Sequence, residues 1–425
     1  MQPSKTLGAV IVFAGVVSAF GAAGAQPEVV VGQLATLTGP TSEVAKAYAQ
    51  GITDSFRFVN DKGGINNVPV NLITANTEYD TLKAIAIYDN WISTIKPPAI
   101  QGWGTPDTEA LIGAVTRDQI AFMSGSSSGH LTDPTGRSPW TEVKAPYNFF
   151  YGPSYSDGCR GLLQWAAEDW NKTSASTRST FLGDIFRPKF VYMGDNHPYP
   201  NSPKGACIEY ARELGFEVVP PIRYTLQPGD FSAQCASLKQ IGANYVFLAN
   251  TADSNVALVK ACAEQGVAAQ FMTNIYGWDE TAAKRAGDAG NGMVWVVTTA
   301  TWNDQVPGME TLRLISKTGD TSGSTYRPVA YIRGVCSALL MRDAVAAAAK
   351  DGAVTGSKIK DAFEKMKEHV PAGLEGVCLP STYTPTDHRG TTTVMLYRSD
   401  YNYGNVQLRR IFETNIPRRP DWLGW

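Results

Sequence analysis

The stretch VVVGQLATLTGPTSEVAKAYAQGITDSFRFVNDKGG, residues 29–64, decides the fold of this chain. It opens with an apolar run over 29–34, which predicts a buried strand, and a turn follows at Thr38-Gly39-Pro40. A helix is predicted from about Ser42 to Lys62, because apolar side chains recur there at helical spacing: Tyr48, Ile52, Phe56 and Val59. This strand–helix unit is the start of a parallel sheet.

The same alternation of strands and helices continues along the chain. In the first part it predicts strands at 69–74, 99–102 and 121–124 and helices at 81–95 and 106–117. It restarts after the Pro/Gly/Ser-rich segment 133–153, with strands at 190–193, 217–220, 244–249, 270–272 and 292–298 and helices at 157–170, 203–214, 231–241 and 254–265. Alternating strands and helices indicate parallel sheets covered on both faces, so we predict an α/β fold of two doubly wound parallel-sheet lobes.

The last third of the chain is expected to complete these lobes. It contains predicted helices at 328–350 and 357–367 and a hairpin at 391–398 with 406–412, too little for a third domain. The predicted division gives 26–148 with 300–386 to lobe 1 and 149–299 with 387–412 to lobe 2, and leaves a tail at 413–425. Arg418 and Arg419 in that tail are interpreted as solvated.

The first 25 residues have the pattern of a secretory signal peptide. Lys5 precedes an apolar run over 7–20, and the small-residue motif Ala23-Gly24-Ala25 indicates cleavage before Gln26. No later run is long enough to span a membrane, so we predict no membrane insertion and, in a bacterium with two membranes, a periplasmic location. The net charge of −2 and the scattered basic residues predict no nucleic-acid partner.

All six cysteines follow residue 150, and an exported protein permits disulfides. Sequence alone cannot choose among the pairings, and some of the thiols on predicted apolar helix faces have the alternative of being free and buried. No C-x-x-C motif occurs, and His197 has no second ligand at helical spacing, so we predict neither a metal nor a cofactor.

Candidate binding residues come from the loops that follow the strands, since ligands of open parallel sheets bind at the carboxyl ends of the strands. These loops are 36–40, 103–105 and 125–129 in the first lobe, and 195–199, 250–253 and 274–279 in the second. Their hydroxyl, amide and aromatic side chains suit hydrogen bonding and stacking. The candidates taken from them are Trp103, Thr105, Ser126, Ser127, Tyr199, Thr251, Tyr276 and Asp279.

Two of these loops allow more than one interpretation. Thr105 precedes Pro106 and is expected to cap its helix, where its hydroxyl and the free backbone N–H groups would also suit a carboxylate. The segment Gly125-Ser126-Ser127-Ser128-Gly129 has the form of the nucleophile elbow of serine hydrolases. That elbow requires a helix directly after the nucleophile, whereas Asp133-Pro134 and Gly136 follow here. A secreted serine hydrolase using Ser127 is therefore kept only as the alternative.

Several local motifs together give the chain a family resemblance. In order they are 37–40, 58–65, 77–79, 194–199, 230–232, 270–272 and 387–390. On these motifs the chain resembles the leucine/isoleucine/valine-binding family of periplasmic binding proteins, of the type I fold, over nearly the whole mature length. The resemblance implies two lobes joined by three crossings, a ligand enclosed between them, and hinge closure that the permease and ATPase subunits of an ABC importer depend on.

The resemblance also implies roles for individual residues. Thr105 and Ser127 match hydroxyls that hold the ligand's carboxylate, Tyr199 and Thr251 (or Ala252) match positions lining the cleft, and Asp157 matches a polar position at the lobe junction. One departure concerns the acid that pairs with an ammonium group in the amino-acid binders, because that position falls on Ile275 or Tyr276 here. The nearest acid is Asp279.

We therefore expect an extracytoplasmic solute-binding protein without catalytic activity. The expected solute is small and polar or aromatic: an amino acid, an amide or urea, or an aromatic carboxylate. The alternatives are a periplasmic sensor that presents its ligand-bound form to a membrane receptor, the serine hydrolase described above, and a module that binds another protein.

Overall fold

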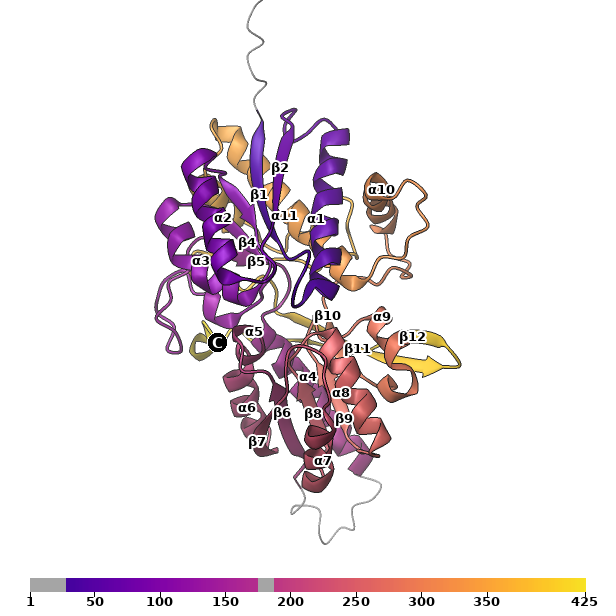
Figure 1. Ribbon diagram of the computed structural model, residues 1–425. Helices are drawn as coiled ribbons and strands as arrows, with labels where there is room; N and C mark the ends of the chain where they lie inside the picture. The colour runs from indigo at the N-terminus through magenta and orange to yellow at the C-terminus, as the bar shows by residue number, and fades with distance from the viewer. Residues whose placement is uncertain (1–27, 175–186) are drawn as a thin grey trace, which may run out of the picture.

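The computed structural model describes residues 28–174 and 187–425, and shows two α/β lobes placed end to end (Figure 1). The predicted leader and the cleavage site after Ala25 lie outside these residues. The fold class predicted from the alternation of strands and helices is confirmed. No helix in the described ranges is long and apolar enough to cross a membrane.

The first lobe is built on a five-stranded parallel sheet in the order β2-β1-β3-β4-β5. Its strands are β1 (Val29–Ala35), β2 (Val70–Asn76), β3 (Ala99–Gln101), β4 (Ala121–Ser124) and β5 (Asn148–Phe150). The helices α1 (Ser42–Asp61), α2 (Thr81–Thr94) and α3 (Thr105–Asp118) connect them. Later helices return to this lobe: α10 (Met309–Gly319), α11 (Val329–Ala348) and α12 (Gly356–Phe363), which pack on α1, on each other and on β4.

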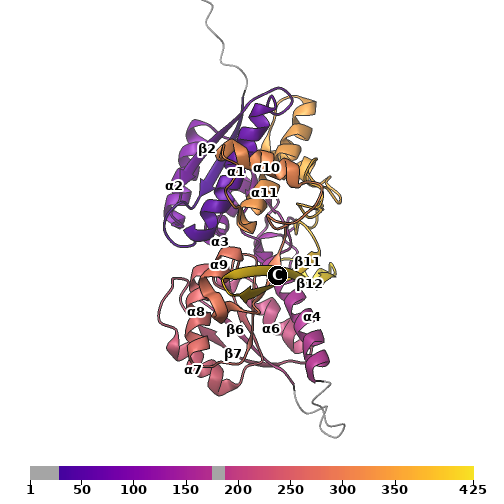
Figure 2. The ribbon, with the colours of Figure 1, turned by 90° about the vertical axis from the view of Figure 1, so that its right-hand side faces the viewer.

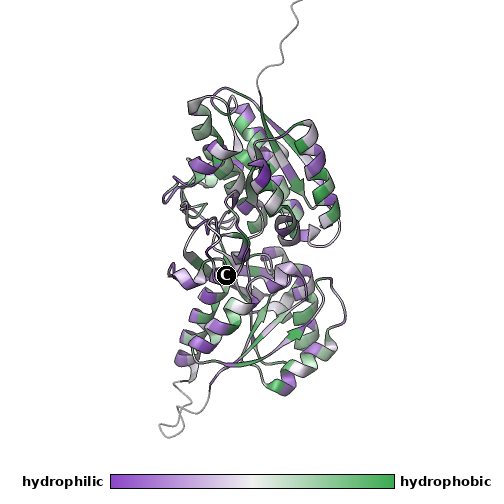
Figure 3. Ribbon diagram, turned by 90° about the vertical axis from the view of Figure 1, so that its left-hand side faces the viewer, coloured by the Kyte–Doolittle hydropathy of each residue, from purple (hydrophilic) through white to green (hydrophobic). Residues whose placement is uncertain are grey.

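The second lobe contains a seven-stranded sheet in the order β12-β11-β10-β9-β8-β6-β7. Its strands are β6 (Lys189–Gly194), β7 (Glu217–Arg223), β8 (Tyr245–Leu248), β9 (Gln270–Thr273), β10 (Val294–Val297), β11 (Thr393–Asn402) and β12 (Asn405–Asn415). Its helices are α4 (Tyr155–Ser174), α5 (Pro198–Asn201), α6 (Lys204–Glu213), α7 (Ser232–Ile241), α8 (Ala252–Glu264) and α9 (Glu280–Ala286). The predicted hairpin is the antiparallel pair β11–β12, which extends this sheet beyond β10. Figure 3 shows its strands as largely hydrophobic between more mixed helices.

Two glycines bring α1 and α11 unusually close. A Cβ atom added at Gly51 would lie 2.2 Å from the Tyr331 carbonyl oxygen, and one at Gly334 would lie 2.1 Å from the Tyr48 carbonyl oxygen. The Tyr48 hydroxyl also donates to Ser337 Oγ on α11, at 2.9 Å. These contacts fix the position of α11 along α1, and with it every side chain that α11 presents to the lobe junction.

The chain end packs between the lobes (Figures 1 and 2). The sequence instead predicts a solvated tail at 413–425. Trp422 and Trp425 are buried, and the Trp425 ring stacks on Trp140 with ring centroids 3.9 Å apart. Arg418 lies within 3.9 Å of the buried Asp157 carboxylate, and Arg419 pairs with Glu213 at 3.0 Å. The prediction of a solvated tail is therefore wrong, because the tryptophans supply apolar surface that the basic residues did not reveal.

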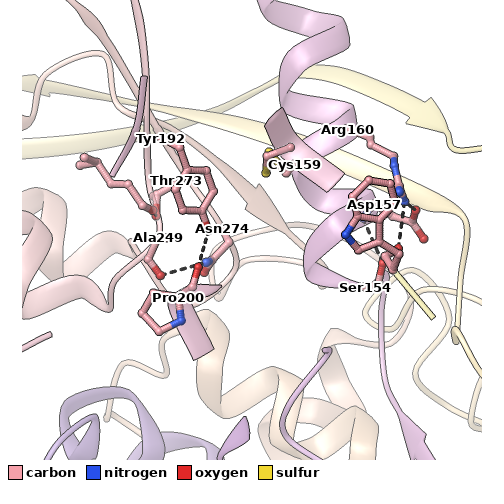
Figure 4. The surroundings of a disulfide bond; sticks show 12 residues. Ser154, Asp157, Cys159, Arg160, Tyr192, Pro200, Ala249, Thr273 and Asn274 are labelled. Carbon is pink, nitrogen blue, oxygen red and sulfur yellow. Dashed lines mark hydrogen bonds and ion pairs between the residues drawn. A yellow bond between two sulfur atoms is a disulfide. The ribbon is translucent and has the colours of Figure 1, made fainter. Parts of the chain in front are cut away.

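All six cysteines form disulfides, which settles the pairing that sequence left open. Cys159–Cys207 joins α4 to α6, Cys235–Cys262 joins α7 to α8, and Cys336–Cys378 joins α11 to the segment before β11. Figure 4 shows Cys159 beside the junction residues of α4. The alternative of free, buried thiols is excluded for these residues.

Candidate functional site

A pocket lies between the lobes where the carboxyl ends of both sets of strands face each other. Its lining comes from lobe 1 and lobe 2 alike: Thr41, Tyr79, Trp103, Gly104, Thr105, Tyr155, Tyr199, Thr251 and Tyr276. The cavity left between them is about 10 Å³, close to the space that a single water molecule needs. The lobes are therefore closed on each other, and their side chains nearly fill the space between them.

The lobe 1 wall is a chain of buried hydroxyl groups at the start of α3. Thr105 Oγ1 lies 2.7 Å from Ser126 Oγ, and both side chains are buried. The helix begins at Thr105 with Gly104 at the cap position, one residue before the predicted cap. A Cβ atom at Gly104 would lie 2.4 Å from the Tyr79 ring, so only glycine lets the ring approach the helix start. Trp103 Nε1 donates to Thr41 Oγ1 at 3.0 Å.

The lobe 2 wall is mainly aromatic. The Tyr199 hydroxyl donates to Asn274 Oδ1 at 2.7 Å, and the Tyr199 ring packs against Tyr155 with centroids 5.3 Å apart. Tyr276 packs on Trp103 of the other lobe at 4.8 Å. Its hydroxyl donates to the carbonyl oxygen of Gly125 at 2.7 Å, so this tyrosine connects the two lobes directly.

Arg333 of α11 lies behind this wall and was missed by the sequence reasoning. Its side chain is buried, and its three nitrogens donate to hydroxyls at 2.9 Å (Tyr276), 2.6 Å (Ser127) and 3.3 Å (Thr298). Those hydroxyls come from lobe 2, from lobe 1 and from the end of β10, so Arg333 joins all three parts of the junction. A signal existed in the sequence, since this arginine interrupts the otherwise apolar run VAYIRGVCSALLM at 329–341.

The surroundings of Arg333 carry no negative charge. Burial raises the pKa of the nearby tyrosine hydroxyls, which are therefore neutral at physiological pH: Tyr48, Tyr151, Tyr155 and Tyr276. A guanidinium stays protonated in proteins, so Arg333 is charged. None of the ion pairs found in residues 28–174 and 187–425 includes it, so no carboxylate balances this charge. The centroids of the Tyr151 and Tyr276 rings lie 5.8 and 5.2 Å from the Arg333 guanidinium carbon.

The nine candidate residues from the sequence fall into three groups. Five line the pocket: Trp103, Thr105, Tyr199, Thr251 and Tyr276. Ser126 and Ser127 stand directly behind it, bonded to Thr105 and Arg333. Asp157 and Asp279 are not part of the lining and bond to other residues of the protein. Thr41, Tyr79, Gly104 and Tyr155 also line the pocket, although they were not among the candidates. Gly104 belongs to the strand-end loop 103–105 but has no side chain, and the other three lie outside the loops that the strand-end rule identifies.

Asp157 and Asp279 each have a partner within the protein. Asp157 Oδ1 accepts from Arg160 Nη1 at 2.8 Å, and both side chains are buried (Figure 4). They lie where the chain end packs, since Arg418 is 3.9 Å from Asp157 and the Trp422 ring is 4.0 Å from the Arg160 guanidinium carbon; this is called the rear side of the junction. Asp279 caps α9, accepting from the Ala282 amide at 2.7 Å and from the Thr281 hydroxyl at 2.7 Å. Asp253, the other acid near this wall, pairs with Arg285.

The Gly125–Gly129 segment does not have the geometry of a nucleophile elbow. It leaves β4 as a loop and is followed by a short 3-10 turn, Gly129–Leu131, and not by an α-helix. Ser127 Oγ accepts a hydrogen bond from Arg333, and within the described chain no histidine is bonded to it. The arrangement supplies hydrogen bonding at Ser127 and no base to activate it.

These features define a class: two-lobed binding proteins that enclose a solute at the facing ends of two parallel sheets. A family model described as periplasmic binding protein matches residues 28–404. The Leu/Ile/Val-binding protein homolog 1 of Brucella abortus is 23% identical over 298 residues, covering 68% of this chain and 71% of that protein.

Two solved structures show the same fold. One, a branched chain amino acid ABC transporter from Thermus thermophilus with bound valine, has a TM-score of 0.78 at 19% identity and covers 92% of this chain and 97% of its own. The other, an ABC transporter solute binding protein from R. palustris in complex with 4-hydroxybenzoate, has a TM-score of 0.72 at 18% identity, covering 93% and 99%. The chain belongs to the periplasmic binding protein family, in its type I fold, which confirms the resemblance read from the sequence motifs. Members of this family work outside the cytoplasm.

Proposed function

We propose that this protein captures a small solute between its lobes and delivers it to an ABC importer. The observation that carries the proposal is the pocket itself, whose lining is drawn from the strand ends of both lobes. The closed lobes leave about 10 Å³ between them, so a solute enters when they are apart and the lining side chains rearrange around it as they close. Contacts to both lobes form only on that closure, so binding shifts the population toward a closed form. No catalytic step is assigned to the protein.

The moving bodies are proposed to be 26–148 with 300–386 and 149–299 with 387–412. The crossings near 150, 298 and 390 lie side by side, since the Tyr151 hydroxyl donates to the Thr298 carbonyl at 2.6 Å and the Thr391 amide donates to the Gly152 carbonyl at 3.3 Å, which supports a three-strand hinge. The closed form would be the one that permease and ATPase subunits respond to. We further infer export to the periplasm by a signal peptide removed after Ala25.

The ligand class follows from what the pocket offers. Its lining contains hydroxyls and aromatic rings and no acidic side chain. The two acids that could replace the missing ammonium partner, Asp279 and Asp253, are engaged by a helix start and by Arg285. An unpaired buried ammonium is costly, so this favours a solute without one over a plain α-amino acid.

The proposal is tested by a thermal-shift panel on residues 26–425. The panel would contain amino acids including valine, short amides and ureas, and aromatic or aliphatic carboxylates including 4-hydroxybenzoate. A solute at about 100 times its dissociation constant adds roughly 2.7 kcal/mol of stability, a shift of several degrees. Small-angle scattering of the same samples would report closure. The absence of a shift from every class would overturn the proposed function.

A further inference from the structure

We propose that Arg333 is the anion receptor of this pocket, and that the solute is an aromatic carboxylate whose acid group pairs with this guanidinium. This rests on the proposed function and deepens it, because it names the chemical class of the solute and the residue that selects it. Two features carry the inference: an uncompensated buried cation, and the aromatic walls in front of it.

The charge of Arg333 is expensive as the protein alone holds it. The residue is 2% exposed, and its hydrogen-bond acceptors are the hydroxyls of Ser127, Tyr276 and Thr298. Neutral hydroxyls satisfy the geometry of the five guanidinium donors only in part and leave the charge itself unbalanced. A carboxylate matches the fork of a guanidinium with two parallel hydrogen bonds, which makes it the natural partner.

Arg333 lies behind the pocket lining and is connected to it through hydroxyl groups. Tyr276 both lines the pocket and accepts from Arg333 Nε, so the guanidinium is one hydroxyl away from the lining. On the other side Thr105 lines the pocket and bonds to Ser126, the neighbour of Ser127. An acid group entering between Tyr276 and the serines would accept from the guanidinium N–H groups that these hydroxyls leave free, while the hydroxyls keep Arg333 in position.

The remainder of the solute would meet flat apolar surfaces. The Trp103 and Tyr276 rings pack across the lobes at a tilt of 58°, with centroids 4.8 Å apart, and Tyr155 and Tyr199 pack edge-on at 5.3 Å from each other. Offset and edge-on packing against such rings stabilises another aromatic ring. The Tyr199 and Tyr79 hydroxyls, both kept neutral because burial raises their pKa, supply hydrogen bonds to a polar substituent on it.

Two other acids lie near the lining and bear on this choice. Asp107, in the first turn of α3, accepts from Thr77, and burial raises its pKa to about 6. Glu43 of α1 lies beside Thr251, and burial raises its pKa as well. Neither lines the pocket and neither pairs with Arg333. Burial favours the neutral form of both acids, whereas the guanidinium stays charged, so Arg333 is the cation nearest to the lining.

The test compares solutes that differ only in charge, on wild type and on Arg333→Met. By calorimetry, 4-hydroxybenzoate is expected to bind wild type, and its neutral isostere 4-hydroxybenzamide to bind roughly a hundredfold more weakly. Arg333→Met should lose about the same factor toward 4-hydroxybenzoate and little toward the amide, and Arg333→Lys should recover part of it. Arg342→Met, on the same helix and paired with Asp343 at 2.6 Å, is the matched control and should bind as wild type does.

The melting temperature of the protein without solute separates a binding role from a structural one. Removing an unbalanced buried charge should leave Arg333→Met at least as stable as wild type. Undiminished binding of 4-hydroxybenzoate by Arg333→Met, equal binding of acid and amide by wild type, or a preference for valine would each overturn the inference while leaving solute capture intact. Failure of every compound to bind would remove the proposed function and this inference with it.

Discussion

Two buried arginines, one on each side of the lobe junction, are held in opposite ways. Arg160, on the rear side, is 1% exposed and pairs with Asp157 at 2.8 Å, with the Trp422 ring 4.0 Å from its guanidinium carbon. Arg333, behind the pocket, is 2% exposed and is bonded to hydroxyls only. A buried charge that serves the fold alone is balanced where it stands. The contrast identifies Arg333 as the charge that the fold does not explain.

The rear side contains further buried ion pairs. Arg389 pairs with Asp387 at 2.7 Å, and Arg418 lies 3.7 Å from the same carboxylate. The chain end closes over this group through Trp422, whose carbonyl oxygen accepts from Arg389. The ion pairs at the rear of the junction are therefore interpreted as structural, and the pocket in front of Arg333 as the candidate binding site.

The largest expected effect comes from unbalancing the rear. Asp157→Ala leaves Arg160 buried without its carboxylate, which should lower the free energy of unfolding by about 3–5 kcal/mol. Urea denaturation would measure it, with Asp361→Ala as control, because that carboxylate is exposed and pairs with Lys360 at the surface. If Asp157→Ala kept its stability but lost solute binding, the structural role would be contradicted. Asp157 would then be a ligand-binding residue, as expected from the family resemblance.

Glu280 is a buried acid and so provides a comparison of opposite charge with Arg333. Glu280 is buried, and its pKa is raised to about 7 from 4.5 by burial and by the charge of Asp279, with Tyr326 as the other titratable neighbour. Its contribution to stability is full below about 4.5 and is lost as the pH rises through about 7. Since one pKa unit corresponds to about 1.4 kcal/mol, the loss is about 3 kcal/mol at most.

Glu280→Gln cannot ionise and should remove this dependence. Urea denaturation at pH 5 and pH 8 should show wild type losing more stability than the variant over that interval. Burial raises the pKa of Tyr326 above its ordinary value, so this neighbour stays neutral over the interval in wild type. Parallel pH dependences in the two proteins would show that Glu280 is not the group responsible.

A smaller effect is expected at the front from Tyr276→Phe. The change removes a hydroxyl that accepts from Arg333 and donates to Gly125 of the other lobe. Hydrogen bonds to charged groups contribute about 2 kcal/mol, so solute affinity should fall roughly thirtyfold. Tyr210→Phe is the control, since its hydroxyl accepts from Gln164 within lobe 2. Equal affinities for the two variants would separate Arg333 from the pocket.

The smallest effect should come from Thr105→Ala. Its hydroxyl bonds to Ser126 and lines the pocket, and a neutral hydrogen bond contributes about 1 kcal/mol, so affinity should fall about fivefold without unfolding. Thr116→Ala in the same helix is the matched control, because that hydroxyl donates to its own helix at Ile112. Titration calorimetry on both variants would decide whether the start of α3 contacts the solute.

The sequence predicted what depends on local periodicity and failed where distant segments meet. The spacing of Tyr48, Ile52, Phe56 and Val59 located α1, and the strand-end rule located Trp103, Thr105 and Tyr276. The predicted division assigns 300–386 to lobe 1, but it could not place Arg333 at the junction, because helical spacing does not say which side of α11 faces the other lobe. The tail was misjudged because Trp425 finds its partner Trp140 far back in the chain.

The glycine contact between α1 and α11 has a consequence for substitutions at position 333. Gly334 cannot accept a side chain while the Tyr48 carbonyl lies against it, and the adjacent position 333 points toward the site from a helix fixed in this way. The residue that fixes the helix position, Gly334, and the residue proposed to select the solute, Arg333, are therefore adjacent in the sequence. If Arg333 selects the solute as proposed, exchanging residue 333 would change the charge behind the same pocket while Gly334 keeps the helix in place.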